Sequence, residues 1–210
     1  MHKLLSFFLI LMLPVIASAQ YPGYSPVKDA EGFRKKFSEQ AALTKSLESD
    51  FEQEKHMSLL SEKIISKGKF WFQREQKVRM EYVTPSPYLV IMDADKVSIR
   101  SGKKETSVST GGNRLFKQLS RIISDCVRGT VVPNPDFKVK IYEAPAGYLI
   151  EMIPVGKALK EFFSRIVVYA DRKSLQVDKV ELFEPSGDYS ILRFQNRKTN
   201  VPLSDSLFHL

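Results

Sequence analysis

Short segments of alternating apolar and polar residues, separated by turn signals, constrain the fold of this sequence most strongly. The clearest is residues 68–82, in which Phe70 and Phe72 share one face of a strand and Val78 can lie opposite them on the returning strand. Similar segments continue almost to the end of the sequence. Their spacing predicts an antiparallel meander of about eleven strands.

Two amphipathic helices are predicted among these strands. In the first, Asp29 is the expected N-cap, and Phe33 and Phe37 begin an apolar stripe that continues to about residue 45. The second covers residues 111–129, between two groups of strands. A meander with so few helices must bury its inner face. We therefore predict an α+β fold, a curved antiparallel half-barrel with a helical lid over an apolar cavity.

The first nineteen residues have the pattern of a secretory signal peptide. Lys3 precedes a short apolar run, and Ala17-Ser18-Ala19 forms a small-x-small cleavage signal before Gln20. We expect cleavage there, export of the protein, and a single domain over residues 20–210. An uncleaved N-terminal anchor is the alternative.

The net charge and the cysteine content limit which partners and bonds we expect for this protein. The sequence has a formal net charge of +8, which favours anionic partners such as lipid headgroups, but it contains no nucleic-acid-binding module, so no nucleic acid is expected. Its one cysteine, Cys126, can form no internal disulfide. Because Cys126 lies on the apolar face of the second predicted helix, we interpret it as a core residue, with a reactive thiol as the alternative.

No catalytic constellation is visible. His56 and His209 lie far from any nucleophile motif, and carboxylates are scattered along the strands. Asp93 and Asp95 resemble a sparse metal loop, but the spacing of a calcium loop is missing, which favours a plain turn. We expect a binding protein rather than an enzyme, with no metal and no cofactor.

The candidate site combines an apolar face with one arginine. Arg74 is in phase with the apolar face of its strand, where an unpaired charge would be costly. Either it lies at the cavity rim and its five donors hold the lid through backbone carbonyls, or it simply faces solvent at a strand end. The expected sheet-side lining, subject to strand register, is Phe70, Phe72, Val78, Met80, Tyr82, Leu89 and Ile91. The expected lid-side lining is Leu119, Ile122 and Ile123.

An ordered set of motifs resembles the LolA family, the periplasmic carriers of outer-membrane lipoproteins. It includes Gly-Lys-Phe-Trp-Phe-Gln-Arg at residues 68–74, Arg-Met-Glu-Tyr at residues 79–82, Thr84-Pro85, and residues 200–208. The resemblance covers nearly all of the mature chain. The sequence departs from the family at Glu75, where proline is common, and at Val78 and Met80, where aromatic residues are usual.

The resemblance implies a cavity for acyl chains and assigns the family's lid-holding arginine to Arg74. It also implies acylated lipoproteins as cargo, an inner-membrane ABC-type exporter as donor and an outer-membrane acceptor. On this basis we expect a soluble, monomeric carrier located in the periplasm. Because relatives of this fold also serve as lipid-binding or stress-sensing modules, a non-carrier module remains the alternative hypothesis.

Overall fold

The computed structural model describes residues 21–60, 62–74, 77–93, 96–109, 122–123, 125–126 and 134–210. Its strands are β1 (Ser25–Pro26), β2 (Ser46–His56), β3 (Lys63–Gln73), β4 (Lys77–Thr84), β5 (Tyr88–Asp93), β6 (Lys96–Ser101), β7 (Lys104–Ser109), β8 (Phe137–Ala144), β9 (Gly147–Pro154), β10 (Arg165–Asp171), β11 (Val177–Phe183) and β12 (Tyr189–Thr199). Its helices are α1 (Ala30–Ala42), the short α3 (Lys157–Lys160) and the 3-10 helix η2 (Asp205–Phe208).

The strands form one antiparallel sheet with the order β1-β8-β9-β10-β11-β12-β2-β3-β4-β5-β6-β7. Strands β1 and β7 are its two edges, so the described sheet does not close into a barrel. This confirms the predicted α+β half-barrel. The described sheet has twelve strands rather than eleven, because β1 pairs two residues of the expected irregular lead-in with Tyr142 and Glu143 of β8.

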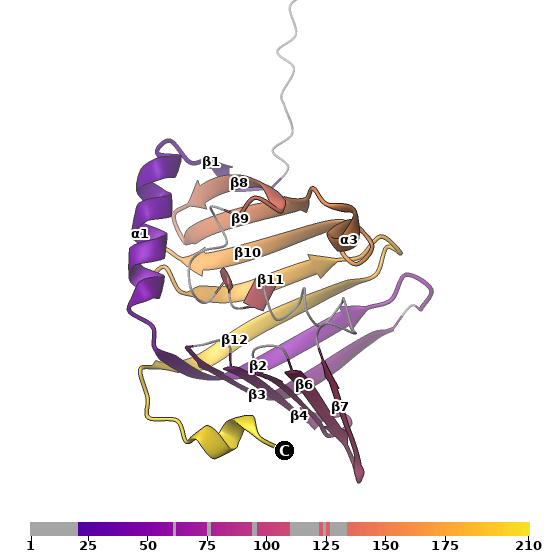
Figure 1. The fold of residues 1–210 in the computed structure, drawn as a ribbon. Helices are drawn as coiled ribbons and strands as arrows, with labels where there is room; N and C mark the ends of the chain where they lie inside the picture. Colours follow the sequence, from indigo (N-terminus) through magenta and orange to yellow (C-terminus); the bar gives the residue numbers. More distant parts are fainter. Residues whose placement is uncertain are drawn as a thin grey trace, which may run out of the picture.

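The sheet curls into two walls (Figure 1). Strands β8–β11 form the upper wall, with α1 crossing their left-hand ends, and β2–β7 form the lower wall. One core cluster joins the upper wall to α1 and includes Ile122 and Cys126. A second covers the inner face of the lower wall, and Ile123 packs against it. The helical residues Ile122, Ile123 and Cys126 are therefore divided between the two clusters.

Helix α1 begins as the sequence predicts. The Asp29 carboxylate accepts a hydrogen bond of 2.8 Å from the backbone N–H of Gly32, which satisfies one of the free donors of the first turn. Phe33 and Phe37 are buried one turn apart with stacked rings, 5.4 Å between centroids, and Phe33 also contacts Tyr148 of β9. Burial of each phenylalanine stabilises the docked helix by about 1.5–3 kcal/mol. The helix ends at Ala42, about three residues earlier than expected.

The last residues of the chain cover part of the outer face of the lower wall. Phe208 of η2 is buried against Leu89 and Ile91 of β5, with Trp71 of β3 beside them. The Arg79 guanidinium donates a 2.9 Å hydrogen bond to the carbonyl oxygen of Leu207. Strand β5 is consequently buried on both faces.

Several sequence predictions lie outside the described residues, among them the signal peptide, Glu75, Asp95 and Leu119. Of the second predicted helix, only residues 122–123 and 125–126 are described, and they are helical. Helix α3 forms where a plain connection was expected. In the described part of the chain, no helix has the length and hydropathy needed to cross a membrane.

Candidate binding cavity

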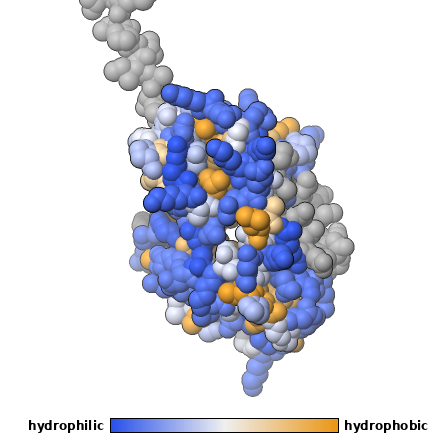
Figure 2. All heavy atoms as spheres, turned by 90° about the vertical axis from the view of Figure 1, so that its left-hand side faces the viewer, coloured by the Kyte–Doolittle hydropathy of each residue, from blue (hydrophilic) through white to orange (hydrophobic). Residues whose placement is uncertain are grey.

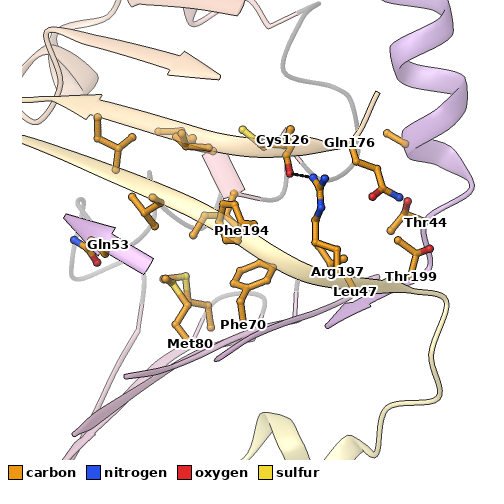
Figure 3. Close-up of a pocket in the computed structure, with 18 of the residues that line it drawn as sticks. Thr44, Leu47, Gln53, Phe70, Met80, Cys126, Gln176, Phe194, Arg197 and Thr199 are labelled. Carbon is orange, nitrogen blue, oxygen red and sulfur yellow. Dashed lines mark hydrogen bonds between the residues drawn. The ribbon is translucent and has the colours of Figure 1, made fainter. Parts of the chain in front are cut away.

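A cavity of about 250 Å³ lies between the two walls of the sheet (Figure 3). Its lining is mainly apolar and comes from both walls and from the helices. The lower wall contributes Leu47, Phe70, Met80, Val90 and Met92, and the upper part of the sheet contributes Val177, Val180, Leu182, Leu192 and Phe194. Helix α1 contributes Phe37 and Ala41, and the helical residues add Ile122, Ile123 and Cys126. The helices therefore cover an apolar space inside the half-barrel.

Five of the expected lining residues contact this cavity, namely Phe70, Met80, Tyr82, Ile122 and Ile123. Phe72 and Val78 are fully buried in the same lower-wall core but do not line the cavity. They support the wall from within.

Leu89 and Ile91 require a correction, because they face the outer side of the sheet against Phe208. Register is the physical reason. Met80 of β4 lies directly opposite Val90 of β5, and residues opposite each other share one face of a sheet. Val90 therefore points into the cavity, together with Tyr88 and Met92.

Contributions from β11 and β12 were absent from the sequence prediction, although a signal for them exists. Leu192 and Phe194 alternate with the charged Arg193, and Val180 and Leu182 alternate with Glu181. This alternation marks an inner face as clearly as it does in the hairpin of residues 68–82.

Aromatic side chains join the walls of the cavity. The Phe70 ring meets the Phe194 ring edge-on, with centroids 5.3 Å apart, and so links β3 to β12. Tyr82 stacks on Tyr88 at 4.0 Å, and its hydroxyl donates a 2.6 Å hydrogen bond to the side-chain oxygen of Gln53. Burial raises the pKa of the Tyr82 phenol far above its ordinary value, so the hydroxyl remains neutral.

Cys126 also faces this space and carries no charge at neutral pH. Its thiol is buried and free, and burial, followed by the nearby Asp125, raises its pKa from 9.0 to about 12. These properties agree with a core residue.

One end of the cavity is polar. Its lining there consists of Gln40, Thr44, Gln176, Arg197 and Thr199. Figure 3 shows Thr44, Gln176, Arg197 and Thr199 together on the side nearest α1, whereas Phe70, Met80 and Phe194 lie farther from that helix. Figure 2 shows the face that carries α1, which is mostly hydrophilic, with apolar residues beside a hollow near its centre.

Arg74 does not line the cavity and is exposed, but it holds the segment that follows α1. Its guanidinium donates from Nη2 to the carbonyl oxygen of Ala42 and from Nε to that of Thr44, the latter at 3.0 Å. Its backbone N–H donates to the carbonyl oxygen of Lys45 at 2.9 Å.

Asn200, which sequence reasoning did not single out, completes this arrangement. Its side-chain nitrogen donates to the carbonyl oxygen of Leu43 at 3.1 Å, and its side-chain oxygen accepts from the N–H of Lys45 at 2.7 Å. Four successive carbonyls, from residues 42 to 45, are therefore held by Arg74 and Asn200. We call these contacts the α1 clamp. They explain why α1 ends at Ala42.

The comparisons with known proteins agree with this architecture, which is that of a binding or chaperone fold. The model of the family described as outer membrane lipoprotein carrier protein LolA matches residues 42–210. The chain belongs to the LolA family, which confirms the resemblance found in the sequence. No curated protein matches the sequence.

The chain is also similar to several solved structures. An uncharacterized conserved protein from Thermus thermophilus is 8% identical with a TM-score of 0.51, over 84% of this chain and 91% of the other. MucB is 13% identical with a TM-score of 0.50, over 88% of this chain and 63% of MucB. A LolA superfamily protein from Nitrosomonas europaea is 8% identical with a TM-score of 0.45, over 84% of this chain and 97% of the other. At these identities the similarity concerns the fold alone.

Proposed function

We propose that this protein is a periplasmic carrier that binds the acyl chains of lipoproteins in its cavity and moves them from the inner to the outer membrane. The observation that carries the proposal is the apolar cavity between the walls of an open half-barrel, in a member of the LolA family. The proposal includes cleavage after residue 19, so that residues 20–210 form the carrier domain.

The energetics of an acyl chain require such a space. Each buried methylene contributes about 0.8 kcal/mol, so a chain of about fifteen carbons would cost on the order of 10 kcal/mol to expose to water. A compartment between two membranes is aqueous, and a carrier has to shield the chain throughout the passage.

The size of the cavity supports a moving cover. Its volume of about 250 Å³ is slightly below the roughly 300–1,000 Å³ typical of small-molecule sites. A lipoprotein with more than one acyl chain would need α1 to move away from the sheet. The α1 clamp then becomes the gate, because polar bonds at its surface can break and reform as cargo enters and leaves. We assign Arg74 to this gating role.

Delivery requires partners on both membranes. We propose an inner-membrane ABC-type exporter as donor and an outer-membrane acceptor as recipient, with the carrier acting as a monomer. The basic character of the sequence, with a net charge of +8, favours encounters with anionic surfaces.

Binding is tested by titrating the purified protein with a fluorescent fatty acid and by mass spectrometry of co-purified lipid. Saturable binding of the probe and acyl lipids in the preparation are expected. Absence of both would refute the carrier.

The alternative is a non-carrier module of the same fold, a lipid-binding or stress-sensing protein, and the fold shared with MucB supports considering it. Transfer of a lipoprotein between membrane vesicles separates the two. A carrier moves lipoprotein to acceptor vesicles, whereas a sensor forms a stable complex with a membrane protein and transfers nothing.

A further inference from the structure

Arg197 is the one charged side chain among the described residues that line the cavity. It is half-buried on β12, at the polar end beside α1 (Figure 3). A cation in an otherwise neutral cavity is costly unless something on the protein or on a ligand offsets its charge.

A backbone irregularity places this arginine inside. Strand β12 pairs Gln195 with Asp50 of β2 and then Lys198 with Glu48, so β12 carries one extra residue at this point. Asn196 takes up the irregularity with a φ of 52°, a left-handed conformation that asparagine tolerates better than most residues. Without the bulge, alternation from Phe194 would point residue 196 inward instead. Bulges of this kind often re-aim a side chain beside a functional site.

The turn before β11 shows a second backbone irregularity at the same end. Leu175 lines the cavity with a φ of 54°, which is unusual for leucine, and Gln176 beside it also lines the polar end. Uncommon backbone conformations therefore occur twice at the polar end of the cavity, once in β12 and once in the turn before β11. Such conformations persist where the surrounding structure enforces them, and they cluster at binding sites.

The Arg197 guanidinium keeps donors available. Its Nη1 donates to the carbonyl oxygen of Val177, and a guanidinium has five N–H donors in all. Among the described residues, no carboxylate forms an ion pair with Arg197. The charge of Arg197 also acts on Asp178. Burial raises the pKa of the Asp178 carboxyl, and the positive charge of Arg197 partly opposes that rise.

We propose that the polar end of the cavity binds the anionic head of an acyl ligand, a carboxylate or phosphate, with Arg197 contacting the head and the apolar walls contacting the chain. This inference rests on the proposed acyl binding and adds acidic amphiphiles to the ligands that the cavity can hold. A guanidinium suits both heads, because its planar donors can pair with two oxygens at once. The side chains of Thr44, Gln176 and Thr199 add neutral hydrogen-bonding groups at the same place.

A purely structural role is the competing explanation, since the bond to Val177 also ties β12 to β11. The test therefore compares ligands that share a chain and differ in the head. Palmitate, hexadecyl phosphate and uncharged monopalmitoylglycerol displace a bound fluorescent fatty acid from the full-length mature protein at pH 8. The variants are Arg197→Met, Arg197→Lys and, as a matched control on the outer side of the same strand, Arg193→Met.

We expect Arg197→Met to weaken binding of at least one acidic ligand about tenfold or more while the neutral ligand changes less than twofold. Arg197→Lys should keep part of the preference, and Arg193→Met should match the wild type. Loss for palmitate alone would identify a carboxylate head, and loss for hexadecyl phosphate alone would identify a phosphate head.

Three results would overturn the inference. A wild type that binds neutral and acidic ligands equally would leave acyl binding intact but remove the head-group site. An equal loss for all three ligands in Arg197→Met would assign the residue a structural role. Failure of every ligand to bind the wild type would remove both this inference and the proposed carrier function.

Discussion

Replacing Arg74 by leucine should loosen the end of α1 without unfolding the sheet. The substitution removes the guanidinium bonds to the carbonyls of Ala42 and Thr44 but keeps the backbone bond to Lys45 and both contacts of Asn200. Two hydrogen bonds from a cation would be worth several kcal/mol if buried. Because Arg74 is exposed, we expect a local loss of about 1–2 kcal/mol.

Hydrogen exchange measures this loss directly. The N–H groups of Leu43 and Thr44 bond to the carbonyls of Gln40 and Ala41 in the last turn. Their exchange should accelerate about 5–30-fold in Arg74→Leu, the factor that corresponds to 1–2 kcal/mol, while amides in β9 and β10 keep their protection. Arg79→Leu is the matched control, because that arginine also donates to a backbone carbonyl but at η2, on the outer face.

The same variant tests whether the α1 clamp acts as a gate for cargo. In the proposed carrier, the α1 clamp stabilises the closed, empty form, so weakening the clamp would remove part of the free energy that drives release. Arg74→Leu should therefore accept lipoprotein and deliver it poorly. Unchanged exchange at residues 43 and 44 would refute the structural reasoning, and normal transfer by the variant would refute the gating role.

Three further perturbations follow from the cavity and the sheet. Leu192→Trp should lower affinity for a fluorescent fatty acid more than tenfold, because each displaced methylene costs about 0.8 kcal/mol, whereas Val83→Trp at an exposed strand end should not. Alkylation of Cys126 at pH 8 should be about 1,000-fold slower in the folded than in the unfolded protein, since its pKa is raised from 9.0 to about 12. The same shift stabilises the folded state below pH 9, and this contribution is lost as the pH rises towards 12. Gly68→Ala should lower the Tm by about 5–10 °C, because the added Cβ would lie 2.0 Å from a carbonyl oxygen of β4, and Gly156→Ala, with no atom within 4 Å, should leave it unchanged.

The sheet was predictable where polar and apolar residues alternate clearly. In β3 and β4, charged neighbours such as Lys69, Arg79 and Glu81 mark the outer face, so Phe70 and Met80 were assigned correctly to the inner one. In β5 the run from Leu89 to Met92 is entirely apolar, because η2 covers its outer face. In such a strand, alternation does not show which residues face the cavity. Only the pairing of β5 with β4 determines that.

The polar end of the cavity was not predictable from periodicity. A single extra residue in β12 reverses the phase after Gln195, and nothing in the sequence around Asn196 marks that shift. The α1 clamp was equally hard to predict from the sequence, since Asn200 lies more than 150 residues from Leu43 and Lys45. Of the clamp residues, only Arg74 could be proposed from the sequence, because a charge in phase with an apolar face is costly unless it is paired.

Photocrosslinking of a bound lipoprotein tests the central claim most directly. A lipoprotein carrying a photoreactive group at the end of its acyl chain would be loaded onto the purified protein, irradiated, and mapped by mass spectrometry. Crosslinks are expected on cavity residues of β3, β4, β11 and β12, such as Phe70, Met80 and Leu192. Crosslinks confined to the outer face around Leu89 and Phe208, or none at all, would contradict acyl binding inside the half-barrel.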